Sequence, residues 1–391
     1  MQAPLRHLLL ALCTGLGTLA CSTLPKNCPP PPPPLPHIHY EAATWEQLPG
    51  WRSDALQEAW PALVSSCEAL AARAPQWSEI CAGVRAQPPS DASQARSFLE
   101  RNFVAYRIVR QIGRETQSSG LITGYFEPQL AGSRSASARF NVPLYAPPPD
   151  LLTVDLGALY PELKGKRVRA RLEGHRVVPY YSRAELSSDP QLGGAEIVWV
   201  DDALGAFVLE VQGSGRVQLP DGQIIRLHYA DENGHPYHSI GRYLVDRGEL
   251  TLEQATMPGI RRWAAAHPQR LQELLDANPS VVFFREEPLR DPTQGPRGSL
   301  GVPLTAGRSI AVDRSVIPLG APVFLASTWP GTTIALDRLV LAQDTGGAIR
   351  GAPRADLFWG TGEQAAERAG NMRQSGAMWL LWPKGLALPA G

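Results

Sequence analysis

Two aspartates near the carboxyl-terminal end of the chain, Asp344 and Asp356, have the sequence surroundings of catalytic acids. Asp344 follows the apolar run Leu339–Ala342, which predicts a buried strand, and it precedes a glycine-rich turn. Asp356 comes directly before Leu-Phe-Trp-Gly, so we expect Phe358 and Trp359 to form an aromatic ledge of the kind on which sugar rings stack. The two carboxylates therefore predict acid chemistry on a carbohydrate.

The Asp-Thr-Gly triplet that begins at Asp344 admits two other interpretations. Its carboxylate can accept backbone N–H bonds in an Asx-type turn, which is a purely structural role. The triplet after an apolar strand is also close to the signature of aspartic proteases, which share one proton between two carboxylates. The chain contains one such triplet, so a protease site would need two copies of the chain.

The amino-terminal residues predict export and lipid attachment. Residues 1–20 contain the apolar run Leu8–Leu19, which is too short to cross a membrane and suits the core of a signal peptide. The Thr-Leu-Ala-Cys sequence that follows resembles the lipobox of bacterial lipoproteins, in which Cys21 becomes the lipidated first residue. An ordinary signal peptide is the alternative. Ser22 resembles the residue that sorts lipoproteins to an outer membrane.

A run of prolines, Pro29–Pro34, predicts an extended tether over residues 21–40. A partner-binding proline motif is the alternative. The rest of the chain is long enough for two domains, and its many Gly (36) and Pro (37) residues favour a loop-rich β architecture. Lys and Arg balance Asp and Glu at 37 each without a long basic run, so we expect no nucleic-acid partner.

Cysteine and histidine positions indicate a disulfide but no metal site. Cys67 and Cys81 lie in two stretches with helical spacing, 53–68 and 75–85, and they are the expected disulfide in an oxidising compartment. Cys28 is left over. His235 and His238 flank a proline, which argues against two ligands on one helical face, and no third ligand is evident. We expect no metal and no cofactor.

The remaining pattern predicts helices, a β domain, and then a second group of strands. Helical spacing is expected over Ala92–Gln117, Leu250–Asp276 and Thr361–Asn371. In the β domain, from about residue 119 to 247, the strands are expected at 197–200, 206–211, 215–219 and 224–229. The later strands are expected at 281–284, 303–313, 316–326, 339–343 and 377–382, with 303–313 and 316–326 paired to each other.

Two pieces of the β domain have the composition of binding loops. Gln212 and Ser214 stand among glycines that let a ligand approach the backbone, although a bulge between strands explains the same residues. Ser239 is expected to cap the helix that follows it.

Six short motifs, together with the lipobox, resemble the membrane-bound lytic murein transglycosylase A family from about residue 41 to about residue 384. The motifs are Thr123–Pro128, Val211–Gly215, Tyr237–Arg242, Asn278–Phe284, Val312–Gly320 and Gln343–Gly351. The carboxyl-terminal part resembles the three-aspartate (3D) domain, whose aspartates are here Asp313, Asp344 and Asp356.

The resemblance implies a mainly β fold with amino-terminal helices. A double-psi β-barrel domain would be built from residues 41–128 and 277–391, and a second β-barrel domain, residues 129–276, would be inserted as the other wall of a glycan groove. The residues implied to face the glycan are Thr123, Tyr125, Gln212, Gly213, Ser214 and Ser239.

The resemblance also implies a reaction. The family cleaves the β-1,4 bond between N-acetylmuramic acid and N-acetylglucosamine without water, as the C6 hydroxyl attacks the anomeric carbon and leaves a 1,6-anhydro end. Asp356 would be the acid and then the base, with its pKa raised by the apolar residues 357–359, and Asp344 and Asp313 would assist. Because the loop before Asp356 is one residue longer than in some relatives, Asp344 remains the alternative acid/base.

Two other functions stay open. A hydrolase would use a second carboxylate to hold water, and a glycan-binding lipoprotein would keep the groove without the chemistry. The expected partners are peptidoglycan strands, the membrane through Cys21, and other cell-wall enzymes. The expected location is the periplasmic face of an outer membrane, as a monomer.

Overall fold

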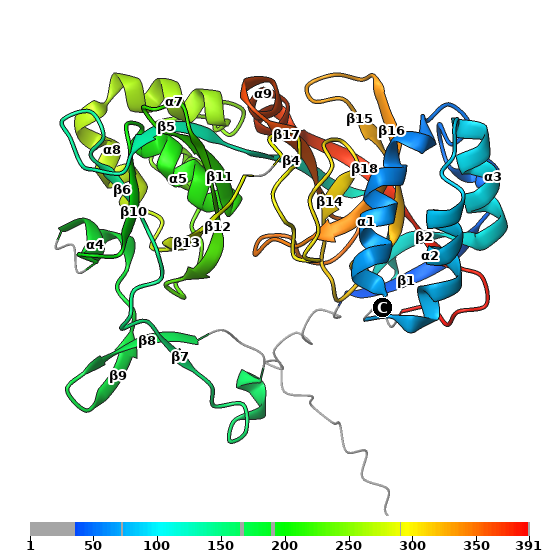
Figure 1. Cartoon of the computed structure of the whole chain (residues 1–391), viewed down its shortest axis with the longest axis horizontal. Coiled ribbons are helices and arrows are strands. Elements are labelled where there is room, and N and C mark those ends of the chain that lie inside the picture. Colours follow the sequence, from blue (N-terminus) through cyan, green and yellow to red (C-terminus); the bar gives the residue numbers. More distant parts are fainter. Residues whose placement is uncertain (1–35, 72, 165–167, 189–191, 290, 390–391) are drawn as a thin grey trace, which may run out of the picture. The chain divides into compact units, whose positions relative to one another are not determined.

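The computed structural model describes residues 36–389 except 72, 165–167, 189–191 and 290. The predicted signal peptide, the lipobox, Cys28 and the proline run therefore lie outside the described residues. The fold is mainly β, with helices near its amino-terminal end (Figure 1). Within the described residues, no helix has the length and apolar character needed to cross a bilayer.

Six strands close into a barrel. β18 pairs with both β15 and β4, so the hydrogen-bonded order β18-β15-β16-β14-β17-β4 returns to its start. β1 and β2 continue this sheet from the far end of β18, and β3 pairs with β2. The bounds are β1 His37–Ala43, β2 Phe103–Ile112, β3 Glu115–Gln117, β4 Gly120–Glu127, β14 Ser309–Ala311, β15 Pro322–Thr328, β16 Ala335–Asp344, β17 Ala355–Thr361 and β18 Arg373–Pro383.

The barrel is assembled from both ends of the chain, because β4 precedes the inserted segment and β14 to β18 follow it. The double-psi connectivity stays a prediction. β1 begins at His37, so the last residues of the predicted tether belong to a strand that pairs with β2.

The inserted segment forms a second sheet of six strands in the order β13-β12-β11-β5-β10-β6. Its closure into a second barrel stays a prediction. The predicted end of the insert at residue 276 is wrong, because β13 pairs with β12 and buries Phe283 and Phe284 in the insert. The bounds are β5 Gln129–Ser133, β6 Val142–Tyr145, β10 Glu196–Val200, β11 Ser214–Gln218, β12 Ile224–Glu232 and β13 Val282–Glu287.

Three further strands of the insert form a small sheet of their own in the order β7-β8-β9 (Figure 1). Their bounds are β7 Leu152–Val154, β8 Val168–Glu173 and β9 Arg176–Pro179. The helices of the insert are α4 Arg183–Ser188, α5 Ala203–Gln212, α6 Ile240–Asp246, α7 Met257–Ala266 and α8 Leu271–Asp276.

A buried ionic network joins the barrel to the insert at Glu127, the last residue of β4. Its carboxylate is 0% exposed and accepts hydrogen bonds from Arg216 at 2.8 Å and from Arg226 at 2.7 Å. The same arginines donate to the carbonyl oxygens of Pro292 and Gln294, in the segment that returns from the insert to the barrel. One carboxylate therefore holds both connections between the two sheets.

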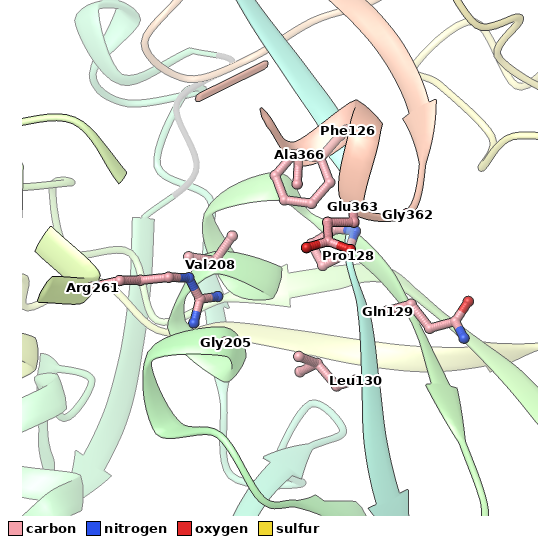
Figure 2. Close-up of a pocket in the computed structure, with 10 residues that line it drawn as sticks. All are labelled: Phe126, Pro128, Gln129, Leu130, Gly205, Val208, Arg261, Gly362, Glu363 and Ala366. Atoms are coloured by element: carbon pink, nitrogen blue, oxygen red, sulfur yellow. The ribbon is translucent and has the colours of Figure 1, made fainter. Parts of the chain in front are cut away.

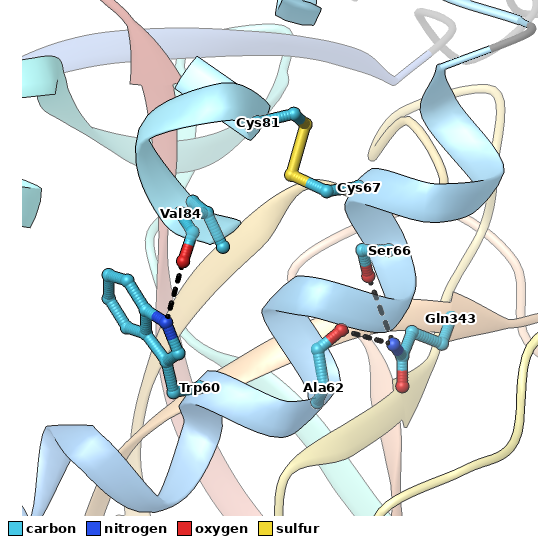
Figure 3. The surroundings of a disulfide bond; sticks show 7 residues. All are labelled: Trp60, Ala62, Ser66, Cys67, Cys81, Val84 and Gln343. Atoms are coloured by element: carbon cyan, nitrogen blue, oxygen red, sulfur yellow. Dashed lines mark hydrogen bonds between the residues drawn. A yellow bond between two sulfur atoms is a disulfide. The ribbon is translucent and has the colours of Figure 1, made fainter. Parts of the chain in front are cut away.

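The amino-terminal helices pack on the barrel and share its hydrophobic core. They are α1 Trp60–Leu70, α2 Ser78–Ala86 and α3 Ala92–Asn102, and α9 Glu363–Asn371 follows β17. A disulfide joins Cys67 of α1 to Cys81 of α2, the pair expected from the sequence (Figure 3). Both cysteines are fully buried, so the bond is part of the core.

Replacing both cysteines by serine should lower the free energy of unfolding by about 3 kcal/mol, because a bond that closes a loop of this length restricts the unfolded chain by roughly that amount. Urea unfolding with and without a reductant measures the effect. The wild-type midpoint should fall in the reductant, and the midpoint of the Cys67→Ser, Cys81→Ser variant should not. Equal wild-type midpoints in both conditions would contradict the prediction.

The helix predicted over Ala92–Gln117 is wrong beyond Asn102. Residues 103–112 form β2 instead, because the aromatic and β-branched residues there pair with β1 on one side and β18 on the other. The helical spacing in this stretch reflected residues buried on both faces of a strand.

The predicted strand over residues 206–211 is also wrong, because these residues lie inside α5. Asp202 caps the helix by accepting the Gly205 N–H at 2.8 Å, and Gly213 ends it in the left-handed region at φ 75°. Every residue from 204 to 209 is buried, so the helix has no polar face from which its period could be recognised.

The predicted pairing of residues 303–313 with 316–326 does not form. β14 and β15 both pair with β16, which lies between them. β14 runs parallel to β16, and parallel strands are joined by a crossover connection rather than by a hairpin.

Candidate active site

Asp344 and Asp356 lie on the two strands that flank β14. Asp344 ends β16, Asp356 is the second residue of β17, and both have Ala311 of β14 as their Cα partner. The register of β16 shifts by one residue just before Asp344. Tyr125 points to the face that carries Asp356, and its hydroxyl also bonds Asp344, so the two carboxylates lie on the same side of the sheet. Two strand spacings separate their Cα atoms by roughly 10 Å.

Asp344 is held by four hydrogen-bond donors. The Tyr125 hydroxyl donates to Oδ2 at 3.0 Å, and the backbone and hydroxyl of Ser299 donate to Oδ1 at 2.9 and 3.0 Å. The Thr345 N–H adds a further bond at 2.9 Å. Burial raises the pKa of Asp344 above its ordinary value, although these donors oppose the shift. A carboxylate whose two oxygens both accept hydrogen bonds is suited to keep its negative charge at a fixed position.

Asp356 has a different environment. Arg354 donates to its Oδ1 at 2.9 Å, and the aspartate side chain keeps 21% of its surface exposed. Burial raises the pKa of Asp356, Arg354 opposes the shift, and the charge of Asp344 adds to it. The carboxyl that reaches the surface therefore also keeps its proton to a higher pH than an ordinary aspartate. A general acid needs this combination.

The β4 strand places two more polar side chains beside these carboxylates. Thr123 and Tyr125 are the Cα partners of Asp356 and Phe358, so both point to the face that carries Asp356. Burial raises the pKa of Tyr125 far above its ordinary value, and the charges of Asp344 and Asp356 raise it further. The Tyr125 hydroxyl is thus protonated and acts as a donor to Asp344.

Asp313, the third predicted aspartate, orders the loop between the other two. Its Oδ2 accepts the Gly351 N–H at 2.7 Å, and its Oδ1 accepts two bonds from Ser315. Burial alone would raise the pKa of Asp313, but these hydrogen bonds together outweigh it and hold the pKa below the usual range. The contacts place Asp313 in support of the site.

The structure contradicts the predicted aromatic ledge. Phe358 and Trp359 are 1% and 6% exposed, so neither ring offers a face to a sugar. The Phe358 ring packs against Tyr125 at 5.3 Å, and the Trp359 indole fits against Gly124, where an added β-carbon would lie 2.6 Å from the indole nitrogen. Phe358 lies on the same face of β17 as Asp356, whereas Trp359 alternates with it and lies on the other face. The predicted role of residues 357–359 in raising the pKa of Asp356 stays a prediction.

The predicted binding residues of the insert occupy the corner between α5 and β11. Gln212 accepts the Phe126 N–H at 3.0 Å, which brings this corner against β4 one residue beyond Tyr125. Gly213 ends α5, and Ser214 follows it as a buried residue of β11. Ser239 caps α6 by accepting the Arg242 N–H at 3.2 Å, which confirms the predicted cap.

The sequence did not identify Ser299 as a hydrogen-bond donor to Asp344. The segment around it shows no periodicity, and its one signal is the preceding Gly298. An added β-carbon at Gly298 would lie 2.5 Å from the carbonyl oxygen of Gln343, so only glycine allows this loop to approach β16. Among the described residues, no three His, Cys, Asp or Glu side chains are grouped to hold a metal ion.

The amino-terminal helices fix the strand that carries Asp344. Gln343 precedes Asp344 on β16, and its amide nitrogen donates to the Ala62 carbonyl oxygen at 2.8 Å and to the Ser66 hydroxyl at 3.0 Å (Figure 3). This side chain is completely buried. The hydrogen bonds tie α1, which carries the disulfide, to the residue before Asp344.

A pocket of about 360 Å³ opens where β4 leaves the barrel, and none of the three aspartates lines it (Figure 2). Phe126 faces this pocket and alternates with Tyr125, so the pocket lies on the other face of β4 from the carboxylates. Its lining residues are Phe126, Pro128, Gln129, Leu130, Gly205, Val208, Arg261, Gly362, Glu363 and Ala366.

Two family models match the chain in the order seen in the fold. The MltA specific insert domain matches residues 121–285, and the 3D domain matches residues 308–382. The first match ends inside β13, in agreement with the pairing of that strand within the insert. The second begins just before β14 and ends in β18, so it includes all three aspartates.

Named relatives and solved structures agree with these models. The membrane-bound lytic murein transglycosylase A of Escherichia coli is 31% identical over 287 residues, which cover 69% of this chain and 67% of the relative. The crystal structure of MltA from Neisseria gonorrhoeae, in its monoclinic form, matches with a TM-score of 0.78 and 35% identity, over 90% of this chain and 95% of that one. The crystal structure of E. coli MltA with bound chitohexaose matches with a TM-score of 0.65 and 26% identity, over 88% of this chain and 94% of that one. This chain therefore belongs to the membrane-bound lytic murein transglycosylase A family.

Proposed function

We propose that this protein is a peptidoglycan lytic transglycosylase that cleaves the β-1,4 bond between N-acetylmuramic acid and N-acetylglucosamine and leaves 1,6-anhydromuramic acid ends. The observation that carries the proposal is the unequal pair of carboxylates on one face of the barrel. Asp356 is partly exposed with a raised pKa, and Asp344 is fixed by four donors. The names of the relatives and the chitohexaose bound to the E. coli protein support a glycan substrate.

In this mechanism Asp356 acts twice. As the acid it gives its proton to the leaving oxygen of the glycosidic bond, and as the base it then takes the proton of the C6 hydroxyl while that oxygen bonds to the anomeric carbon. Asp344 stabilises the positive character that develops on the sugar ring. Both oxygens of Asp344 already accept hydrogen bonds, so it is poorly placed to attack the sugar or to activate water, as a hydrolase would require.

The other predicted residues have supporting roles. Thr123, Tyr125, Gln212, Gly213 and Ser214 contact the glycan from β4 and from the α5–β11 corner, and Ser239 contacts it from the start of α6. Asp313 keeps the loop before Asp356 in shape through the Gly351 N–H. Within the described residues, the barrel domain consists of residues 37–128 and 288–389, and the insert of residues 129–287 forms the other wall of the glycan site.

The protein acts at a membrane. Lipid on Cys21 anchors it to the periplasmic face of the outer membrane, and the proline-rich tether carries the catalytic body as a monomer. The membrane-bound relatives and the lipobox-like sequence support this location.

The products of the reaction test the proposal. Purified peptidoglycan is digested with the chain lacking residues 1–21, and the fragments are analysed by mass spectrometry. We expect muropeptides that end in 1,6-anhydromuramic acid. Reducing ends that are heavier by one water would identify a hydrolase. Undigested glycan that still binds the protein would identify a binding protein.

The pH dependence of the reaction should follow the protonation of Asp356. The acid must carry its proton, so kcat/KM should fall as the pH rises through the raised pKa of Asp356. Arg354→Ala removes the cation that lowers this pKa, so the fall of kcat/KM on the alkaline side of the pH profile (the alkaline limb) should move to higher pH. A pH profile of kcat/KM for both proteins measures the shift.

Arg350→Ala is the matched control for the Arg354 variant. Arg350 is an exposed arginine in the same loop, and its charge lowers the pKa of Asp313. The control should leave the alkaline limb where it is. A limb that moves to lower pH in Arg354→Ala, or that moves equally in both variants, would contradict the assignment of Asp356 as the acid.

A further inference from the structure

The small sheet β7-β8-β9 is amphipathic, and its polar face is held against the rest of the insert. The strand registers place only apolar side chains on one face and most of the polar ones on the other. The apolar face consists of Leu152, Val154, Val168, Ala170, Leu172, Val177 and Pro179.

The polar face is attached by its arginines. Arg169 donates to Asp231 of β12 at 2.8 Å, and its side chain is 8% exposed. The Arg171 guanidinium lies 4.0 Å from the centre of the Tyr181 ring. An amphipathic sheet ordinarily buries its whole apolar face. Here that face is covered only in part, because Ala170 is buried and Leu152 and Val154 are half-buried while Val168, Leu172 and Val177 remain exposed.

The residues left uncovered form a distinct group. Half of the large apolar side chains exposed within the described residues, six of twelve, belong to this sheet or to the loop between β7 and β8. We call them the β7–β9 patch: Leu156 (39% exposed), Leu159 (75%), Tyr160 (51%), Val168 (37%), Leu172 (61%) and Val177 (57%). The strand registers place Val168, Leu172 and Val177 on the one apolar face, whereas Leu156, Leu159 and Tyr160 belong to the adjoining loop. Exposed apolar side chains concentrated on one small sheet and its loop mark a surface that contacts another body.

We infer that the β7–β9 patch is a membrane-contact surface, which rests on the lipid bilayer to which the chain is tethered. Fourteen residues, 22–35, separate Cys21 from the first described residue. Even fully extended, fourteen residues span at most roughly 50 Å. A bilayer is therefore always within reach of the catalytic body, and it can cover an exposed apolar surface without matching its shape.

The side chains around the patch also favour lipid. The apolar face carries no charged residue, and the exposed Lys164 and Arg176 lie at its margins, in the loop before β8 and at the β8–β9 turn, where long side chains can reach phosphate groups. The nearby Glu162 and Glu173 balance them, so the attraction comes from apolar burial and should be insensitive to salt. The reach of the tether depends on the proposed lipid anchor, whereas vesicle binding by the chain without that anchor depends on the patch alone.

Flotation with lipid vesicles tests the inference. The chain lacking residues 1–21 keeps the whole compact unit that begins at residue 36, so it can be used without its lipid. It should float with vesicles of phosphatidylethanolamine and phosphatidylglycerol and with vesicles of phosphatidylcholine, at low and at raised salt. The triple variant Leu159→Ser, Leu172→Ser, Val177→Ser should bind at least about tenfold more weakly.

The matched control is Leu252→Ser, Ile334→Ser, because these side chains are 47% and 65% exposed outside the patch. The control should float like the wild type, and both variants should digest soluble glycan fragments at the wild-type rate. A wild-type protein that does not float, or a control that is weakened as much as the triple variant, would overturn the inference. Patch-dependent dimers in sedimentation without vesicle binding would also overturn it and would make the patch an interface between copies.

Discussion

Asp356→Asn should lower kcat by roughly three orders of magnitude, because one positioned acid/base contributes about 10²–10⁴ to a rate. The asparagine is nearly isosteric, and it can still accept the hydrogen bond that Arg354 gives to Oδ1. Glycan binding should therefore change little. Release of 1,6-anhydro products measures the turnover, and binding to insoluble peptidoglycan measures the affinity.

Asp344→Asn is the informative comparison for this prediction. The charge of Asp344 raises the pKa of Asp356, so its removal should move the alkaline limb of the pH profile to lower pH without abolishing it. The loss of charge stabilisation should lower kcat by about 10²–10³. If Asp356→Asn kept its turnover and Asp344→Asn lost both turnover and the alkaline limb, the two roles would be exchanged.

Glu127→Ala should lower the free energy of unfolding by about 3–5 kcal/mol, the usual cost of removing one partner from a buried ionic network. Glu127 is completely buried, and its loss would leave the guanidinium groups of Arg216 and Arg226 without their carboxylate. The Thr361 hydroxyl would lose its acceptor as well. Urea unfolding followed by circular dichroism measures the change.

The control for this prediction is Glu286→Ala. Glu286 forms a two-pronged pair with Arg134 at 2.7 and 2.8 Å, and both side chains are well exposed, at 39% and 44%. Solvent screens such a pair, so its loss should cost less than about 1 kcal/mol. Equal losses in the two variants would show that burial of the Glu127 network has no special effect.

The sequence predicted the barrel strands well where local pattern and burial agree. Leu339–Ala342 is an apolar run and lies within β16, and residues 377–382 lie within β18. The pattern failed where an element is buried all round. α5 has no polar face, so its helical period is hidden, and its recognisable signals are the cap at Asp202 and the glycine at 213.

The candidate site was predictable in its acids but not in their partners. Asp344 and Asp356 stand out because glycines and aromatic residues flank them, and the structure brings them together across Ala311. Ser299 lies 45 residues before Asp344 along the chain, and the tyrosine that bonds Asp344 lies 219 residues before it. Local sequence patterns hold no information about contacts over such separations. The aromatic ledge failed for a related reason, since strand register and not sequence proximity decides which rings are buried.

Asp344 and Asp356 pair with the same residue of β14, and this pairing determines which changes of length the loop between them can tolerate. Residues 345–354 connect Asp344 to β17, and Thr345 and Arg354 at the two ends of this loop donate hydrogen bonds to the carboxylates. The backbone positions of both acids are nevertheless set by their pairing with Ala311. The separation of the acids is a property of the hydrogen-bonded backbone. A change of length between these contacts can therefore leave the spacing of the acids unchanged, as long as Thr345, Gly351 and Arg354 keep their hydrogen bonds to Asp344, Asp313 and Asp356.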